Sequence, residues 1–453
     1  MSLSSILSIA RSALLTHQKA QDVTGHNIAN AYTEGYTRQR LRIQAALPLA
    51  TPWGTVGRGV TDLGVERLRD RYLDATYRYE AGNLGRSDTL RMLLARIESV
   101  FGEPSENGLG AALDAFFNAF SELASDPSSS AARTLVQSTA RSLVRQFNSY
   151  ASGIAQARSD AIVQLRSAAE EVTSLASQIA QLNAQILASG GIANSAPDLA
   201  DQRDRWIDRL AQLAAVRVIE NDNGTVSVIA GDTLLVEAGN ARGVAVQASG
   251  NGFQLVTDGN VTFAPGGGEL AGLLEFIDVR ASDIASRLDT LAGAIVTAVN
   301  GIHRTGVTPG GNTNTDFFDP AGTTALTIAL AAPIAASPLA IAAGTTTAPG
   351  DNSVALALAQ LRGSNLPALG GATPGEYYTD LAAYIGSAAR DADGEAAVAR
   401  SLVTAADMQR QAVSGVSLDE ELTALMVHQQ AYAAAARIVS VANEMMDDLL
   451  NMI

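Results

Sequence analysis

An apolar side chain recurs at alternating steps of three and four residues over the last 36 residues of the chain. Nine of the eleven residues on this line are apolar; the line runs through Leu418, Leu422, Leu425, Gln429, Tyr432, Ala436, Val439, Asn443, Met446, Leu450 and Ile453. A 3.5-residue repeat kept over this length predicts a helix with a left-handed coiled-coil seam. Such a seam needs a partner helix, because an isolated helix with one exposed apolar stripe is only marginally stable.

The start of this helix is marked by a capping-box pattern, in which Ser417 precedes Glu420 by three residues. Asp419, Glu420 and Glu421 fall in the first turn, where the helix dipole favours negative charge. A second line with the same step opens the chain and runs through Leu3, Leu7, Ala10, Leu14, His17, Gln21, Thr24 and Ile28. Two interpretations stay open: both terminal helices pack on the protein's own core, or they pair with each other and with other subunits.

Helical periodicity continues through the middle of the chain, in segments 65–100, 109–124, 129–188 and 197–214. The period then changes to two, because residues 216–219 and 226–229 alternate around an Asn- and Gly-containing turn, which predicts a β-hairpin. Short strand-like runs continue to about residue 264.

A second helical region extends from 269 to 303 after three glycines at 266–268, which we interpret as a flexible entry. Residues 304–350 are rich in Gly, Thr, Pro and Ala, with strand candidates at 324–331 and 338–343. These short, weakly patterned runs predict a continuation of the β-rich region.

Helix returns at 352–413, with breaks predicted at 363–374 and at Gly394. The elements together predict an elongated, mainly α fold with a β-rich insert: paired terminal coiled-coil helices, a long-helix bundle domain and a small central β domain. The predicted divisions are a terminal coiled-coil region of 1–64 and 415–453, a helical bundle domain of 65–215, 266–303 and 352–414, and a β-rich insert domain of 216–265 and 304–351.

Composition excludes several classes of function. The chain has no cysteine, which removes disulfides, thiolate metal sites and cysteine nucleophiles. Its single lysine, Lys19, rules out a Gly-Lys-Ser/Thr phosphate loop. A net charge of −15 argues against nucleic acid as a partner. No apolar run reaches the ~20 residues of a membrane span, and the N-terminus lacks a basic signal-peptide start, so composition alone favours a cytoplasmic protein.

Charge is unevenly distributed along the chain. The first 100 residues carry 13 Lys and Arg against 9 Asp and Glu, a net charge of +4, and the remainder carries −19. Surfaces of unlike charge help subunits associate, although drift in composition explains the asymmetry equally well.

No arrangement of residues in the sequence predicts catalysis. The four histidines, His17, His26, His303 and His428, lack the close spacing of metal ligands, and we interpret them as surface or interface residues. Four aspartates between 198 and 208 alternate with arginines, which favours a solvated, salt-bridged helix face over paired catalytic carboxylates. We therefore expect no catalytic, cofactor-binding or metal-binding residues. The alternative is a cell-wall hydrolase that uses paired carboxylates in the central domain.

The segment Asn27-Ile-Ala-Asn30, followed by Gly35-Tyr36-Thr-Arg38, is not explained by helical periodicity. It resembles the N-terminal signature shared by bacterial flagellar rod, hook and hook-associated proteins, with Glu34 at a position where that family often has proline. The resemblance covers nearly the whole chain and is strongest to the hook-associated members. The matching residues are Asn27, Asn30, Gly35, Tyr36, Arg38, Asp201, Arg203, Asn300 and His303, together with segments 414–422, 430–432 and 446–450.

The resemblance implies a structural subunit that joins the flagellar hook to the filament, with a hook or distal-rod subunit as the alternative. The helical stretch at 65–188 favours the junction, because rod and hook proteins of this family have mostly β middles. The implied partners are a ring of copies of the chain itself, the hook protein, a second, filament-side hook-associated protein and an export chaperone. The implied location is extracellular, reached by type III export without a cleavable signal, which replaces the cytoplasmic expectation. The chain is short for the family, so we expect an outer β domain of longer members to be reduced or missing.

The two seams suggest how such a subunit assembles. We hypothesise that residues 1–35 and 417–453 are largely disordered in the monomer and fold on incorporation, pairing with each other and with neighbouring subunits. The predicted assembly interface consists of Leu3, Leu7, Leu14, Ile28, Leu418, Leu422, Leu425, Tyr432, Val439, Met446, Leu450 and Ile453.

Overall fold

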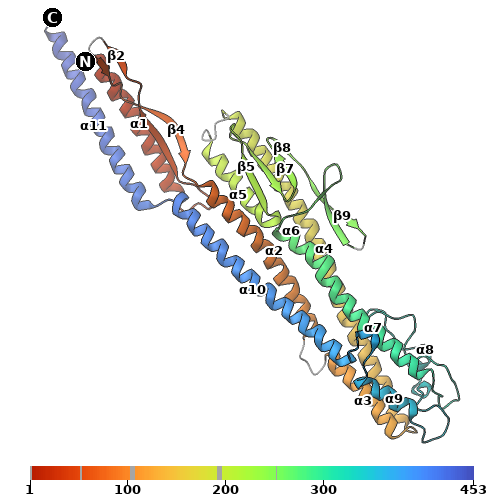
Figure 1. Cartoon of the computed structure of the whole chain (residues 1–453). Coiled ribbons are helices and arrows are strands. Elements are labelled where there is room, and N and C mark those ends of the chain that lie inside the picture. The colour runs from red at the N-terminus through yellow and green to blue at the C-terminus, as the bar shows by residue number, and fades with distance from the viewer. Residues whose placement is uncertain (1–2, 52–53, 103–107, 191–195, 251, 453) are drawn as a thin grey trace.

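The molecule is elongated, with both chain termini at one end (Figure 1). The computed structural model describes residues 3–51, 54–102, 108–190, 196–250 and 252–452. Three parts follow one another along its length: a terminal unit, a helical domain with two small sheets on its side, and a distal end where α3, α8 and α9 gather. The predicted fold class, mainly α with a central β region and an elongated shape, is confirmed.

The terminal unit consists of two helices and a two-stranded ribbon. Helix α1 (Leu3–Asn30) packs against α11 (Leu418–Asn451) and against strands β1 (Gln39–Ala45) and β4 (Val60–Arg67). The two strands pair antiparallel, and a short hairpin of β2 (Leu49–Thr51) and β3 (Gly54–Val56) extends the ribbon. This ribbon lies within a region that the sequence interpretation treated as coiled coil.

The helical domain is built on long helices that lie side by side (Figure 1). They are α2 (Arg71–Phe101), α3 (Leu109–Ser125), α4 (Ser130–Ala188), α5 (Pro197–Ala214), α6 (Gly268–Glu275), α7 (Ala281–His303) and α10 (Pro374–Ser414), with a π-helical turn (Phe276–Arg280) between α6 and α7. Side-chain caps fix several starts: Asp70 accepts from the amides of the first turn of α2, and Thr373 and Glu376 form a capping box on α10. Helix α10 runs unbroken through Gly394, so the break predicted there is wrong.

The two small sheets lie against α4. One has the order β5-β6-β7-β8, from β5 (Val216–Glu220), β6 (Val226–Ala230), β7 (Thr233–Glu237) and β8 (Asn240–Ala241), and the other has the order β11-β10-β9, from β9 (Val244–Ser249), β10 (Gly252–Thr257) and β11 (Val261–Phe263). All of these pairings are antiparallel. The β5–β6 hairpin lies where the alternation predicted it.

The first residue of α6, Gly268, is required for close packing against α5. Gly268 has φ of +79°, and a Cβ there would lie 2.4 Å from the backbone of Leu213 and Ala214 at the end of α5. The interpretation of a flexible entry is therefore wrong for Gly268, whereas a Cβ at Gly266 would meet no atom closer than 3.8 Å. A larger residue would force α6 away from α5.

Residues 304–351 do not form the strands predicted for them. This segment contains α8 (Ala332–Ala336), a 3-10 turn (Pro338–Ala340) and an isolated bridge between Phe318 and Leu330. Its prolines supply no amide hydrogen to a strand ladder. Figure 1 shows this segment at the distal end, beside α3 and α9 (Ser353–Gln360), whereas the strands of 216–265 lie midway along the molecule. The structure thus separates the two segments that were grouped in one β-rich domain.

Candidate functional site: the terminal helix pair and its junction with the helical domain

Helices α1 and α11 form an antiparallel pair that is close-packed through small side chains. Ala10, Ala20 and Thr24 are buried on α1, and Ala435 and Ala442 are buried on α11. Small residues at the contact bring the two helix axes close together. The predicted pairing of the terminal helices is thus present within a single chain, which differs from the expectation that both stretches are disordered before assembly.

The face that α11 turns toward α1 is offset from the predicted seam. The innermost line repeats every seven residues through Glu421, His428, Ala435 and Ala442. Of the predicted interface, Leu3, Leu7, Leu14, Ile28, Leu418, Leu425 and Val439 are half-buried, Leu422, Tyr432, Met446 and Leu450 are exposed, and Ile453 lies outside the described residues. The position of the seam within the single chain was therefore predicted one residue away from where it lies, and the assembly role of these residues stays a prediction.

The surface of α11 that α1 leaves uncovered carries many large apolar side chains. Large side chains that are about 40–65% exposed follow one another along the helix: Leu422, Met426, Val427, Tyr432, Ile438, Val441, Met445, Met446, Leu449 and Leu450. We call this set, which is defined by exposure and includes Leu449 on the continuation of the inner line beyond Ala442, the outer face of α11. A stripe of this length on the surface of one chain is the kind of patch that marks an interaction site.

Asn27 is the hub that fastens α1 to the ribbon and to α11. Its amide nitrogen donates to the carbonyl of Gln39 (2.8 Å) and to a carboxylate oxygen of Glu421 (2.9 Å). Its amide oxygen accepts from the Tyr36 hydroxyl (2.8 Å) and from the backbone amide of Gln39 (3.0 Å). The side chain is 1% exposed and uses its two donors and two acceptor positions. This network explains why the sequence motif leaves the helical pattern at this point.

Arg38 fastens the start of α11 to the same hub. Its Nε donates to Glu421 (2.7 Å) and its terminal nitrogen donates to Glu420 (2.6 Å), while its backbone amide donates to the carbonyl of Ser414 (2.9 Å). Ser417 occupies the N-cap of α11 without a side-chain capping bond. The predicted capping box is therefore wrong, because Arg38 takes the carboxylate that the box needs.

The loop after α1 docks on helix α5. The backbone amide of Thr37 donates to Asp201 (3.0 Å), and the side chain of Gln39 donates to Asp198 (2.8 Å). Gly35 has φ of +72°, and a Cβ there would lie 2.4 Å from the side chain of Arg205. Glycine is thus needed both for the backbone conformation and for close approach to α5.

Asp201 and Asp204 belong to a largely buried ion-pair network. Arg67 bridges both carboxylates at 2.8 Å and 2.7 Å, and Asp204 also pairs with Arg69 and, at 3.3 Å, with Arg78. The prediction of a solvated helix face is wrong for these aspartates, because arginines from β4, the following loop and α2 cover them. The carboxylates are thereby occupied by structural partners rather than paired with each other.

The network continues toward α10. Arg78 donates to Asp208 at 2.7 Å, and Arg410 of α10 pairs with the same carboxylate. The guanidinium of Arg410 also lies 3.8 Å from the ring centre of Tyr77 on α2. Three helices and the ribbon are thereby held together at the point where the terminal unit meets the helical domain.

Burial and charge shift the pKa values of the groups in this network. Burial opposes ionisation of Asp204, but the guanidiniums of Arg69, Arg67, Arg78 and Arg203 outweigh burial and hold the pKa of its carboxyl well below the usual range. Burial raises the pKa of Asp201, with Arg67 opposing the change. Burial, followed by the nearby carboxylates of Asp198, Asp201 and Glu421, raises the pKa of Tyr36. Asp204 is thus a fixed negative charge and Tyr36 a fixed hydroxyl donor at neutral pH.

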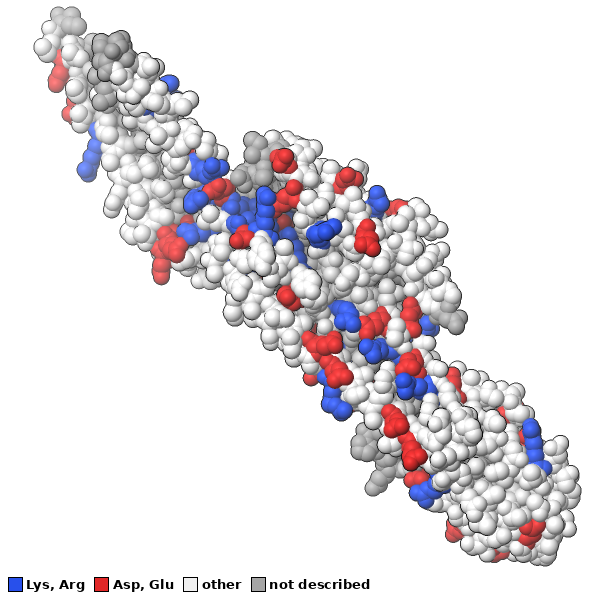
Figure 2. Space-filling model, in the orientation of Figure 1, with Lys and Arg blue, Asp and Glu red and all other residues white. Residues whose placement is uncertain are grey.

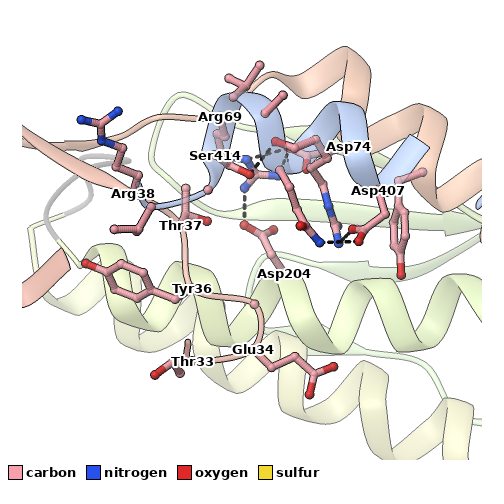
Figure 3. Close-up of a pocket in the computed structure, with 18 of the residues that line it drawn as sticks. Thr33, Glu34, Tyr36, Thr37, Arg38, Arg69, Asp74, Asp204, Asp407 and Ser414 are labelled. Carbon is pink, nitrogen blue, oxygen red and sulfur yellow. Dashed lines mark hydrogen bonds and ion pairs between the residues drawn. The ribbon is translucent and has the colours of Figure 1, made fainter. Parts of the chain in front are cut away.

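A cleft of about 730 Å³ lies at this junction. Its walls are the loop 31–38, the end of α10 and the ion-pair network. Figure 3 shows Asp204 pointing toward Arg69 on one side, with Thr33 and Glu34 on the loop at the opposite side. Figure 2 shows positive and negative side chains gathered here, whereas the terminal unit beyond the junction is mostly uncharged. The cleft is thus lined by the ion pairs that connect the terminal unit to the helical domain.

The remaining motif residues have structural roles elsewhere. Asn30 donates to the carbonyl of His26 (3.0 Å). Arg203 is buried and donates to Asn183 (3.0 Å) and to the carbonyl of Gly224 (2.8 Å), and burial lowers its pKa to about 10. Asn300 binds the backbone of Phe317 and Phe318 at 2.9 Å, which anchors the segment after α7.

His303 is a core residue, which corrects its interpretation as a surface or interface histidine. It is fully buried, with Nδ1 donating to the carbonyl of Thr315 (2.8 Å) and Nε2 accepting from the amide of Ala342 (3.0 Å). Burial lowers its pKa, so the neutral ring is favoured. Within the described part of the chain, no group of three or more His, Cys, Asp or Glu is arranged to hold a metal ion. Of the helices in the described residues, none is long and apolar enough to span a bilayer.

Sequence reasoning missed the arginines that occupy these carboxylates, namely Arg67, Arg69, Arg78 and Arg410. Arg67 is the last residue of β4 and Arg69 lies in the loop after it, so strand alternation gave no signal for the pair. No pattern in the sequence connects them with an aspartate more than a hundred residues away.

Comparison with known proteins assigns these features to a family. The chain is 30% identical to flagellar hook-associated protein 1 of Bacillus subtilis (strain 168), in an alignment that covers 98% of this chain and 97% of the relative. This chain belongs to the flagellar hook-associated protein 1 family. A family model described as "Flagellar hook-associated protein FlgK helical domain" matches residues 94–318. Two further family models match the ends of the chain: "Flagella basal body rod protein" matches residues 7–37, and "Flagellar basal body rod FlgEFG protein C-terminal" matches residues 399–452. The ends of this hook-associated protein 1 family member are thus shared with rod proteins.

Other members of the hook-associated protein 1 family align in the same way. The protein of Escherichia coli (strain K12) is 25% identical, with 99% of this chain and 100% of the relative covered. The fold is similar to the structure of the flagellar hook junction protein FlgK from Burkholderia pseudomallei, with a TM-score of 0.67 and 18% identity over 76% of this chain and 100% of that chain. The alignments with the B. subtilis and E. coli relatives run over 493 and 547 positions, more than the 453 residues of this chain, so the expectation that an outer domain of longer members is reduced or missing stays a prediction.

Proposed function

We propose that this chain is a structural subunit of the bacterial flagellum that joins the hook to the filament, and that it enters the assembly through the outer face of α11. Membership of the hook-associated protein 1 family supports a structural flagellar role. The helical domain matched at 94–318 supports the junction over the hook or distal-rod alternative.

The observation that carries the proposal is the outer face of α11. Helix α11 buries alanines against α1, while large apolar residues elsewhere on it, such as Met426 and Val441, stay 55% and 53% exposed. Covering a half-exposed side chain of this size stabilises a contact by about 1 kcal/mol. Because the face runs along most of a 34-residue helix, repeated subunit contacts through it bury a continuous stripe.

The proposed partners follow from the position of such a subunit. Copies of the chain form a ring through their terminal units, the hook protein lies on one side, and a second hook-associated protein lies on the filament side. An export chaperone is expected to bind the chain before export through the flagellar type III pathway, and the final location is outside the cell. Both chain ends lie at one end of the molecule, which supports a lattice formed by the terminal units with the helical domain projecting from it (Figure 1).

The experiment compares two double variants of matched exposure in a strain that lacks the chromosomal copy. The first is Met426→Ser with Val441→Ser on the outer face of α11, where these side chains are 55% and 53% exposed. The matched control is Leu326→Ser with Leu339→Ser at the distal end, where these leucines are 55% and 56% exposed. Electron microscopy of isolated flagella and quantification of exported protein are the measurements.

We expect the α11 variant to be exported but to leave hooks without filaments, and the control to support normal filaments. Circular dichroism of both purified variants checks that the helical domain is intact. Normal filaments with the α11 variant would contradict the proposal, and so would loss of filaments with both variants at equal export.

A further inference from the structure

Two imidazole rings face each other across the terminal helix pair. Nδ1 of His17 on α1 lies 3.4 Å from Nδ1 of His428 on α11, and the ring centres are 5.6 Å apart with a 39° angle between the planes. Both rings are half-buried. Gln21 fixes the register at this point by donating to the backbone carbonyl of His428 (3.2 Å).

This geometry suits a pair that holds at most one extra proton. When both rings are neutral, one Nδ1–H donates to the other Nδ1. One added proton leaves a charged ring beside a neutral ring, but a second proton places two positive charges 5.6 Å apart. Burial lowers the pKa of His428, the charge of His17 lowers it further, and Glu421 partly opposes both effects.

The other charged groups near the pair are already engaged or lie on exposed surface. Glu421 of α11 is bound by Arg38 at 2.7 Å and by Asn27 at 2.9 Å. Lys19 of α1 is paired with Asp62 of β4 at 2.9 Å. Asp22 of α1 is exposed, and His26 interacts with the hydroxyl of Tyr36 at 3.1 Å. Among the described neighbours, the carboxylate of Glu421 is therefore the one that could offset two charged rings, and it is already bound by Arg38 and Asn27.

We propose that the His17–His428 pair is a pH-sensitive lock, which holds α11 on α1 at neutral pH and releases it when both rings are protonated in mild acid. Two residues that sit at the centre of the terminal pair thus couple the docking of α11 to proton concentration. The effect is a property of the isolated chain, and its consequence for the flagellum, loss of the subunit from the junction in acid, rests on the proposed function.

The sign and size of the effect follow from the same geometry. Because the pKa of His428 is lower in the folded pair than in the unfolded chain, docking is strongest above about pH 6.5 and weakens as pH falls below that value. Two unit charges at 5.6 Å favour opening about 3-fold in a water-like medium and about 100-fold at an effective dielectric constant of about 20.

Hydrogen–deuterium exchange of the full chain at pH 7.5 and pH 5.0 tests the lock, after correction for the pH dependence of intrinsic exchange. We expect opening of segments 10–24 and 424–439 to increase by about 3-fold to about 100-fold in the unmodified chain at pH 5.0. His17→Gln is expected to remove most of this increase, and His26→Gln, the matched control, to retain it. Helix α4 serves as the internal reference.

An equal increase in the unmodified chain and in the His17→Gln variant would overturn the proposal. If that variant opens already at pH 7.5, His428→Gln takes its place in the same comparison. A second readout is the titration of the histidine Cε1 resonances by NMR: removal of His17 should move the titration of His428 upward and leave that of His26 in place. A His428 titration that does not change on removal of His17 would equally overturn the lock.

Discussion

Replacing Asn27 by alanine removes the side chain on which α1, the ribbon and α11 converge. The change deletes two donated and two accepted hydrogen bonds, with heavy-atom distances between 2.8 and 3.0 Å. It leaves the backbone groups of Gln39 and the hydroxyl of Tyr36 without this partner at a site that is 1% exposed. Glu421 keeps its ion pair with Arg38, so the loss there is partial.

The magnitude follows from counting these groups. Three neutral hydrogen bonds contribute about 1 kcal/mol each, and the bond to a carboxylate contributes about 1.5–3 kcal/mol before the compensation by Arg38. Undocking of the terminal unit should therefore become easier by about 3–5 kcal/mol. Opening of α1 and α11 then increases between about a hundredfold and a few thousandfold.

Hydrogen–deuterium exchange at pH 7.5 measures this opening segment by segment. Asn30→Ala is the matched control, because Asn30 lies one turn further along α1, donates one hydrogen bond to a backbone carbonyl and is only half-buried. We expect Asn27→Ala to lose protection in 3–30 and 418–451 while α4 stays protected, and Asn30→Ala to change either region by less than about tenfold. Equal loss in the two variants, or loss spread evenly over α4, would refute the role of Asn27 as the local hub.

Three further outcomes follow from the structure. Asp204→Asn should lower the free energy of unfolding by about 3–5 kcal/mol, because it leaves buried guanidiniums unpaired. The pKa of Asp204 is depressed in the folded state, so its stabilisation is present above about pH 4 and is lost as pH falls below that value. Denaturant titrations from about pH 7 to about pH 3 should therefore show a smaller loss of stability with falling pH in the variant than in the unmodified chain. Gly268→Ala should lower the melting temperature measured by calorimetry through a loss of about 1–3 kcal/mol, as the added Cβ would lie 2.4 Å from the backbone of Ala214; an unchanged melting temperature would show that α6 yields freely. Ala436→Pro should cost about 3 kcal/mol within α11 and abolish incorporation into flagella, with unchanged exchange protection in α4 as the check that the helical domain persists.

The long helices were predictable because their ends carry strong local signals. Helix α4 was predicted at 129–188 and spans Ser130–Ala188, and α5 was predicted at 197–214 and spans those residues. Pro127, Pro197 and a Gly pair after α4 mark these boundaries in the sequence. The hairpin of β5 and β6 was equally predictable, because alternation and a turn coincide there.

Two kinds of feature could not be predicted from the sequence. In one, two apolar lines on a helix are equally regular; in the other, the contact partner lies far away in the sequence. On α11 two neighbouring lines both repeat at coiled-coil spacing, and the line with Ala435 and Ala442 faces α1 because small residues allow closer contact. Asp204 binds arginines more than a hundred residues earlier, which no local pattern shows. The ribbon was missed because its exposed, charged strands lack a buried alternating face.

Methionine oxidation tests the central claim, that the outer face of α11 is covered in the flagellum and open in the single chain. Met426 and Met445 are 55% and 48% exposed on this face, and Met408 on α10 is 67% exposed and serves as a reference. Brief treatment with peroxide, followed by mass spectrometry, measures oxidation at each residue in the purified chain and in intact flagella. The account predicts that Met426 and Met445 are oxidised in the purified chain and protected in flagella when normalised to Met408. Equal oxidation in both preparations would contradict it.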